Sequence, residues 1–473
     1  MVFKYHWTYR KSVSLAPKTR NRLVTSICEA VTTLCEILTN HSSSSNSNEM
    51  SENNNEREAD DASSRSVVPQ NFRDALGCHV YMLYNIMCIS EDEAKLNKQQ
   101  SSMNPKSKGK KSKRSSENEA GSYDSTNSRK QCATAMLEVA EVMSTNKSTL
   151  WNCGVPDENV VSLPYRIACK MLESATNIMT RKSACADEAL KMISASVTVA
   201  DFSSMSTIVA ALMDLLHSYE HIAILMAELC CLLSFENKVN RLAVQLLQEI
   251  GRSNYKVGRS TDTGASGDTA GKASGVKNVA PFISELAKLK PRIVLDNMIH
   301  ILPLLNSEPY MLRNSVVYAI GHIVARFPQE EETSEEISES GDSTDESISE
   351  SSHKSKNVNK TRDNLLDVLI ERTHDRSSYT RCAVLKVWAQ LSESNSIPLD
   401  RLMSVTDLAV DRLQDMSVNV RSKAMKVSLI ALSNCSDINT QNLTLYSFLY
   451  EAANFIIREQ SFLRVSRPCP IPR

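Results

Sequence analysis

A pattern that recurs around three arginines limits the fold more than any other feature of this sequence. The three arginines are Arg313, Arg381 and Arg421. Each follows an apolar helical stretch and a short polar turn, and each precedes apolar residues three and four positions later, the spacing of one helix face. The position six residues before each arginine is polar and holds Ser307, Asp375 or Asp415. The pattern indicates one helix–turn–helix unit that occurs three times.

The spacing of the arginines indicates the type of unit. Arg381 and Arg421 are 40 residues apart, whereas Arg313 and Arg381 are 68 apart. An acidic stretch at roughly residues 330–357 lies in the longer interval, and removing these 28 residues brings that spacing to 40 as well. HEAT and armadillo units repeat about every 40 to 47 residues. The sequence therefore predicts an all-α HEAT-repeat α-solenoid, with stacked antiparallel helix pairs and disordered polar linkers between some of them.

The repeated polar residues have an architectural role in this interpretation. A two-helix unit cannot bury its apolar face alone, so units stack. An aspartate in the turn inside one repeat can pair with the arginine of the next turn, or it can cap the following helix. We therefore expect a ladder that holds the repeats in register, made of Asp375, Arg381, Asp415, Arg421 and Arg313.

Changes in composition divide the chain. Glycine (12) and proline (14) are scarce and aromatic residues make up 5%, which favours helices, but polar runs with little to bury should stay disordered. The expected order is an N-terminal helical segment (1–40), a Ser/Asn/acidic disordered linker (41–70), a short helix (71–95), a disordered basic linker (96–129), helical repeats (130–251), a Gly/Ser-rich linker (252–278), a HEAT repeat (279–329), a disordered acidic insert (330–360), HEAT repeats (361–460) and an irregular tail (461–473). Residues 207–251 read as three short helices, with Gly251 as the left-handed residue that ends the third.

Two patterns that suggest a ligand are better explained otherwise. The stretch GASGDTAGKAS (264–274) lacks the first glycine of a phosphate-binding loop and the Ser or Thr after Lys272, so a flexible linker is favoured. His217 and His221 have the i, i+4 spacing of a metal pair, but no third ligand is evident, and a polar turn between helices is favoured. No nucleophile triad or catalytic carboxylate pair is apparent, so we expect no enzyme activity and no cofactor.

Cysteine usage and hydropathy indicate the compartment. The 13 cysteines include no CxxC pair and are scattered through apolar stretches, as reduced intracellular cysteines are. The N-terminal sequence has no apolar signal region, and no window of about 18 apolar residues exists for a membrane span. We expect a soluble protein that is neither secreted nor membrane-bound.

Two charged segments could carry regulation. The first has a K-K-x-K arrangement typical of an import signal or of loose DNA contact, and its basic residues are Lys106, Lys108, Lys110, Lys111, Lys113 and Arg114. The second is the acidic run 330–350, in which three hydroxyl residues have an acidic residue three places on, as an acid-directed kinase requires: Thr333, Ser343 and Ser347. We expect an import receptor at the first segment and phosphorylation at the second.

Three stretches resemble a known family. Residues 282–324 (FISELAKLKPRIVLDNMIHILPLLNSEPYMLRNSVVYAIGHIV), 365–388 (LLDVLIERTHDRSSYTRCAVLKVW) and 397–432 are similar to the HEAT-repeat, non-SMC regulatory subunits of condensin I, the condensin complex subunit 1 family. Residues 149–174 and 207–251 fit more loosely, so the resemblance covers roughly residues 130–435. Family members are several-fold longer, and the sequence drifts after about Asn442, so we expect a fragment, a splice form or an incomplete gene model.

The resemblance implies a role in mitotic chromosome condensation and segregation. It implies binding to a kleisin subunit, to the SMC ATPases through one head, and to double-stranded DNA without sequence specificity. It also implies a nuclear and mitotic-chromosome location, with cytoplasm in part of the cell cycle. Two alternatives stay open at this point: the HEAT subunit of condensin II, and a HEAT-type transport or phosphatase adaptor.

Overall fold

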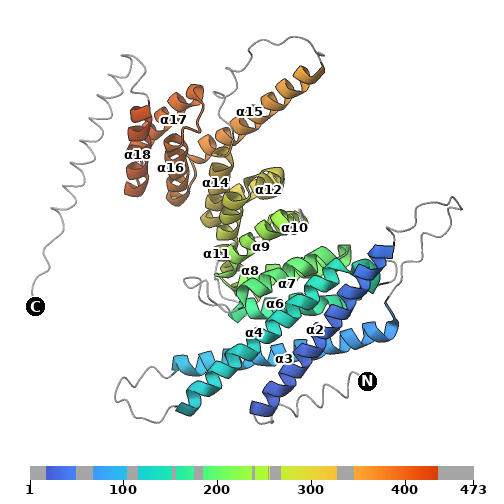
Figure 1. The fold of residues 1–473 in the computed structure, drawn as a ribbon. Coiled ribbons are helices and arrows are strands. Elements are labelled where there is room, and N and C mark those ends of the chain that lie inside the picture. Colours follow the sequence, from blue (N-terminus) through green and yellow to red (C-terminus); the bar gives the residue numbers. More distant parts are fainter. Residues whose placement is uncertain are drawn as a thin grey trace, which may run out of the picture. The chain divides into compact units, whose positions relative to one another are not determined.

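The computed structural model confirms the all-α fold class. It describes residues 17–48, 68–103, 116–151, 156–174, 185–236, 240–253, 255, 268–327 and 346–434, and these contain helices and no strand. The chain divides into two compact units, Met1–Leu246 and Leu247–Arg473. Each unit is built from helices packed against their neighbours, as stacked helical repeats require (Figure 1).

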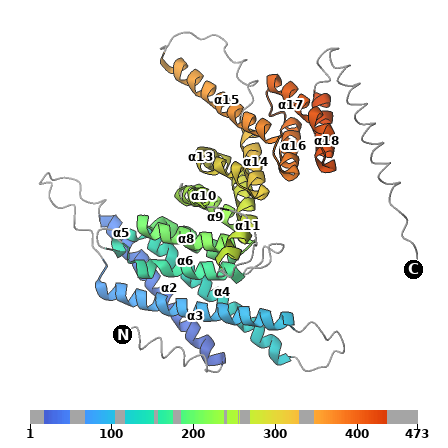
Figure 2. The ribbon, with the colours of Figure 1, turned by 180° about the vertical axis from the view of Figure 1, so that it is seen from behind.

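The first unit begins with long helices. α2 (Pro17–Asn48) packs against α3 (Gln70–Met103) and α4 (Ser116–Thr145), and the short α5 (Lys147–Leu150) follows α4. α6 (Glu158–Ser174) packs on α3, α7 (Ala186–Val199) and α8 (Phe202–Ser218), and α7 also contacts α4 and α9 (Ile222–Glu236). Figure 2 shows α6 and α8 side by side. Fully buried apolar side chains such as Leu83, Met136 and Ile193 form the core of this unit.

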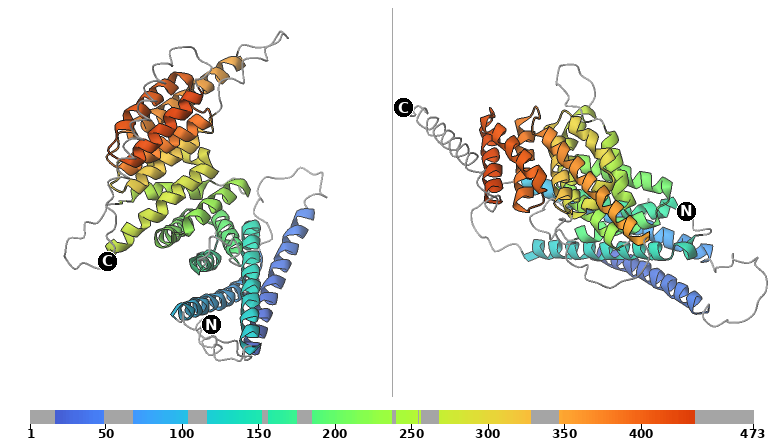
Figure 3. Two further views of the ribbon diagram at one scale, coloured as in Figure 1. Left: turned by 90° about the vertical axis from the view of Figure 1, so that its left-hand side faces the viewer. Right: turned by 90° about the horizontal axis from the view of Figure 1, so that it is seen from above.

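The second unit contains the three arginine repeats. After α10 (Arg241–Arg252), which crosses the unit boundary, come α11 (Asp268–Leu289), α12 (Pro291–Asp296), α13 (Met298–Ile301), η2 (Leu302–Asn306) and α14 (Tyr310–Val324). They are followed by α15 (Glu346–Arg372), α16 (Ser378–Glu393), α17 (Leu399–Asp411), η4 (Arg412–Gln414) and α18 (Val418–Asn434). α11, α14, α16 and α18 pack in that order as one layer, and Figure 3 shows the orange and red helices of this layer side by side.

Several helices extend beyond the boundaries expected from composition. α2 continues to Asn48, α3 continues to Met103, and α4 begins at Ser116, all inside segments expected to be disordered linkers. α11 and α15 likewise begin inside the Gly/Ser-rich linker and the acidic insert. Once a packed turn has nucleated a helix, each further residue adds a backbone hydrogen bond, so polar residues can prolong it without burial. The expected repeats beyond residue 434 and the tail at 461–473 lie outside the described residues.

The expectation for Gly251 was wrong. Residues 207–251 do form three helices, α8, α9 and α10, but Gly251 lies inside α10 and does not have the positive φ of a left-handed cap. A Cβ at this position would lie 2.3 Å from the backbone oxygen of His300. The glycine is therefore needed because another backbone segment passes close to it.

Candidate functional site: a repeated arginine turn and its exposed edge

Arg313 joins two consecutive repeats of the second unit. It lies in the first turn of α14, and its Nε and Nη2 donate to Oδ2 and Oδ1 of Asp375 at 3.0 and 3.1 Å. Asp375 lies in the turn between α15 and α16, and both side chains are only 3% exposed. Asp375 Oδ1 also accepts from the backbone N–H of Ser377, at the start of α16, at 2.8 Å. This is a buried, bidentate ion pair, whose planar geometry fixes orientation as well as distance.

Arg381 makes the same contact one repeat later. Its Nε and Nη2 donate to Oδ2 and Oδ1 of Asp415 at 2.7 and 2.8 Å, and Asp415 Oδ1 accepts from the Ser417 N–H at 2.9 Å. Burial would raise the pKa of Asp415, but the hydrogen bonds from Arg381 and from the Ser417 backbone outweigh it and hold that pKa below its usual range. The same hydrogen bond raises the pKa of Arg381.

Each of the three arginines also donates hydrogen bonds to the turn that precedes its helix. In each case Nη1 donates to the backbone oxygens six and five residues earlier, and these pairs of carbonyl groups belong to Ser307 and Glu308, to Asp375 and Arg376, and to Asp415 and Met416. The polar residue six positions before each arginine is thus part of the turn that the guanidinium closes.

The direction of pairing differs from the expectation. Asp375 and Asp415 pair with the arginine of the preceding repeat and not with that of the next one. The paired residues are 62 apart in the first contact and 34 apart in the second, and the difference of 28 is the length of the acidic stretch removed in the spacing argument. The two aspartate–arginine contacts therefore have the same spacing once the acidic stretch is left out, so α14 and α16, on either side of that stretch, belong to consecutive repeats.

The same turns expose apolar side chains. Tyr310 and Tyr379, in the first turns of α14 and α16, are 39% and 61% exposed, and their rings stack with centroids 4.7 Å apart and planes 18° apart. Met416 in the following turn is almost fully exposed, and Val418 beside it is exposed as well. We call Tyr310, Tyr379, Met416 and Val418 the turn edge. Sequence reasoning missed these residues, although each is an apolar residue beside a turn and outside the core-facing spacing.

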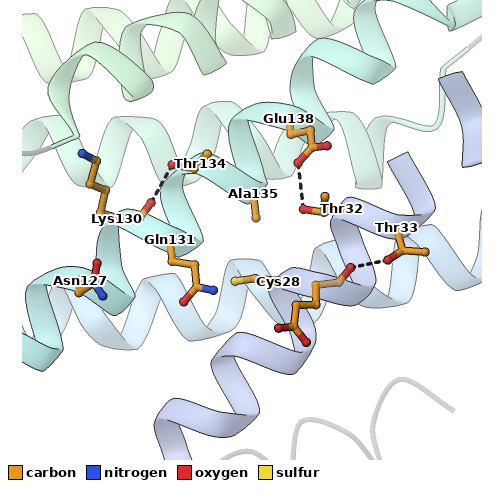
Figure 4. A pocket seen from close by; sticks show the side chains of 10 residues that line it. Cys28, Thr32, Thr33, Asn127, Lys130, Gln131, Thr134, Ala135 and Glu138 are labelled. Carbon is orange, nitrogen blue, oxygen red and sulfur yellow. Dashed lines mark hydrogen bonds between the residues drawn. The ribbon is translucent and has the colours of Figure 1, made fainter. Parts of the chain in front are cut away.

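The first unit contains a polar pocket. It lies between α2 and α4, has a volume of about 680 Å³, and is lined by Cys28, Glu29, Thr32, Thr33, Asn127, Lys130, Gln131, Thr134, Ala135 and Glu138 (Figure 4). Thr32 Oγ1 donates to Glu138 Oε2 at 2.9 Å across the two helices. Sequence reasoning did not identify this pocket, because its walls come from segments about a hundred residues apart.

The sequence also singled out a histidine pair and two charged segments. His217 lies in the last turn of α8, and the ring of His221 bonds to the backbone oxygen of Leu172 at 2.9 Å. No group of three or more His, Cys, Asp or Glu side chains that could hold a metal occurs in the described ranges. None of the helices in those ranges could span a membrane. The basic segment 106–114 and residues Thr333 and Ser343 lie outside the described residues, and Ser347 lies in the first turn of α15.

The fold and the repeated arginine turn define the class: an all-α protein of stacked helical repeats. Residues 17–205 match the family model for the N-terminal part of the non-SMC mitotic condensation complex subunit 1. The chain is 30% identical over 333 residues to condensin complex subunit 1 of Xenopus laevis, which is 70% of this chain and 21% of that protein. It is 27% identical over 296 residues to condensin-1 complex subunit CAP-D2 of Arabidopsis thaliana, and 26% identical over 285 residues to condensin complex subunit 1 of Homo sapiens.

These matches establish that the chain belongs to the condensin complex subunit 1 family. The chain spans about a fifth of the length of these relatives, since the matched parts cover 21%, 19% and 18% of them. The resemblance found in the sequence began at about residue 130. The family model begins at residue 17, so the match also includes the helices before residue 130.

Proposed function

We propose that this chain is a non-catalytic regulatory scaffold subunit of condensin that acts in mitotic chromosome condensation and segregation. In this role it binds the kleisin subunit, one SMC head and double-stranded DNA, and it resides in the nucleus and on mitotic chromosomes, with cytoplasm in part of the cell cycle. Membership of the condensin complex subunit 1 family is the observation that carries the proposal.

The second unit supports a scaffold role. Each guanidinium closes its own turn, and Arg313 and Arg381 also join that turn to the next, so the three turns are held in a fixed relation. A stack of this kind offers an extended surface made of equivalent positions in neighbouring repeats and not an enclosed pocket. The turn edge places stacked tyrosines and a methionine on such a surface, and aromatic residues and methionine are enriched at protein interfaces. We propose the turn edge as the kleisin-binding surface.

The two charged segments complete the proposal. We propose that the basic residues of segment 106–114 serve nuclear import, contact DNA phosphates, or both. We propose Thr333, Ser343 and Ser347 as phosphorylation sites that block or recruit a partner, because added phosphate would increase repulsion in an already acidic stretch. Duplex DNA binding that does not weaken with added salt would contradict phosphate contacts, and phosphosite mapping of mitotic protein tests the three hydroxyl residues.

The deciding experiment is affinity purification of the tagged chain from mitotic cells, with mass spectrometry of the retained proteins. Recovery of two SMC ATPases with the kleisin of condensin I supports the proposal. Recovery of the condensin II kleisin would instead indicate the HEAT subunit of that complex. Recovery of import receptors or phosphatase subunits alone would indicate an adaptor.

A binding measurement with purified proteins tests the turn edge directly, without the other proteins present in cells. The purified chain is titrated with purified kleisin, beside a variant that carries Tyr310→Ala and Tyr379→Ala. Both tyrosines are exposed, so the variant should fold normally, and its loss of binding would place the kleisin at the turn edge. Equal binding by the two proteins would exclude this edge, and absence of binding by either would contradict the kleisin proposal for this part of the protein.

A further inference from the structure

Two cysteine thiols lie close together between α2 and α4. Cys28 on α2 and Cys132 on α4 are 104 residues apart in sequence, and their sulfur atoms lie 3.9 Å apart. Both side chains are buried, and both cysteines are free. A disulfide needs the sulfurs to approach to about 2.05 Å, so a closure of roughly 1.9 Å would bond them, a distance that side-chain rotation and a small helix shift can supply.

The two thiols have different access to small molecules. Cys28 is part of the wall of the polar pocket, and its side chain points from α2 toward α4 (Figure 4). Cys132, on α4, is not among the residues of the wall. A molecule that enters the pocket therefore reaches the Cys28 sulfur first, and Cys132 is placed to react in a second step.

The thiol contact also favours one thiolate over the other. When Cys28 loses its proton, the Cys132 S–H can donate to the sulfur anion, and this hydrogen bond lowers the pKa of Cys28 despite its burial. The same contact raises the pKa of Cys132. Burial is the main cause that raises the pKa of Cys35 and of Cys230 to about 12, and neither has a thiol contact that lowers it, so these buried cysteines stay protonated.

We propose that Cys28 and Cys132 form a peroxide-sensitive pair that oxidises to a disulfide and thereby joins α2 covalently to α4. The Cys28 thiolate attacks one oxygen of hydrogen peroxide, the O–O bond breaks, and the products are a sulfenic acid on Cys28 and hydroxide, which takes up a proton to become water. The Cys132 sulfur then attacks the Cys28 sulfur, the S–O bond breaks, and the thiol proton leaves with the departing hydroxyl as a second water. The two sulfurs together lose two electrons, and the peroxide gains them.

The pocket is large enough to admit the oxidant. Its lining is mostly hydroxyl, amide and charged side chains, and hydrogen peroxide is a small polar molecule that such groups solvate. The disulfide would restrain α2, which otherwise holds its place by packing on α3 and α4 and by the hydrogen bond from Thr32 to Glu138. Reduction by a thiol system would release it again.

The test is peptide mapping of the full chain. Reduced protein is treated with hydrogen peroxide, free thiols are alkylated, and the protein is digested without reductant for mass spectrometry. We expect one dominant cross-linked species that joins the peptides of Cys28 and Cys132, lighter by two hydrogen atoms than their sum, and its loss in Cys28→Ser and in Cys132→Ser. Cys78→Ser removes an exposed thiol on the neighbouring helix and should leave the cross-link intact.

Two results would overturn the proposal. One is full alkylation of both Cys28 and Cys132 after a peroxide treatment that oxidises Cys78. The other is a cross-link from Cys28 to any cysteine besides Cys132. Since the wild-type map decides between these outcomes, the proposal does not depend on the serine variants folding, which circular dichroism checks separately.

Discussion

Removal of the Asp375 carboxylate should lower the free energy of unfolding of the second unit more than a substitution on its surface does. In Asp375→Ala the Nε and Nη2 of Arg313 lose their acceptors at a position that is 3% exposed, and the Ser377 N–H loses its acceptor as well. A buried charge left without its partner costs about 3–5 kcal/mol. The backbone oxygens of Ser307 and Glu308 still bind Nη1, so the lower part of this range is expected, with a loss of about 3 kcal/mol in the free energy of unfolding.

The assay should report on this unit alone, because a stack of repeats need not unfold in one step. Urea titration followed by hydrogen exchange of the α14 and α16 amides meets this need. A matched control is Glu371→Ala, which removes an ion pair to Arg372 from a side chain that is 69% exposed. Exposed pairs contribute about 0–1 kcal/mol, so the control should change little.

A double variant sharpens the test. Adding Arg313→Met to Asp375→Ala removes the unpaired buried charge and keeps much of the side-chain volume. Arg313→Met also removes the hydrogen bonds to Ser307 and Glu308, so the expected result is that the double variant loses less stability than the two single variants summed, which is the non-additivity of residues in direct contact. If Asp375→Ala costs no more than Glu371→Ala, or if the losses of the two single variants simply add in the double variant, the buried pair does not hold the repeats together.

Three further outcomes are expected. The pKa of Asp415 is lowered in the folded state, so its pairing with Arg381 stabilises the folded protein above the ordinary pKa of 3.8. This stabilisation is lost as the pH falls through the folded-state pKa. Asp415→Asn should therefore make the free energy of unfolding depend less on pH below about pH 5, measured by urea titration at several pH values. Gly251→Ala places a Cβ against the His300 oxygen and should cost about 1–3 kcal/mol in urea titrations, since backbone must move. Tyr379→Ala should leave the melting temperature nearly unchanged, because the ring is exposed, yet weaken kleisin binding by about tenfold or more in a titration.

The arginine turns show what the sequence could predict. Arg313, Arg381 and Arg421 could be found because each arginine closes the turn before it through the same backbone oxygens, which places it at the same position in every repeat and leaves a fixed spacing. Which neighbour each aspartate binds could not be found, because an arginine stands both before and after Asp375 at repeat distance. Only the stacking of the helices decides between the two.

The pocket and the thiol pair show where sequence reasoning ends. The sequence predicts an N-terminal helical segment at residues 1–40, and α2 lies there with one face buried. The prediction does not say which other helix covers that face, so it cannot place Cys28 beside Cys132. Helix ends were also misplaced, because the polar turns of α3 and α4 beyond the core carry no apolar signal.

The position of the ion pairs within the repeats determines where such a chain can accept inserted residues. The contacts of Arg313 and Arg381 lie in the turns inside repeats, whereas the acidic stretch separates α14 from α15, at a junction between repeats. A longer connection there costs little, since each doubling of a loop adds only about 0.6 kcal/mol of closure entropy. Junctions between repeats are thus where insertions, and the regulatory sequences they bring, can accumulate while the register of the array is preserved.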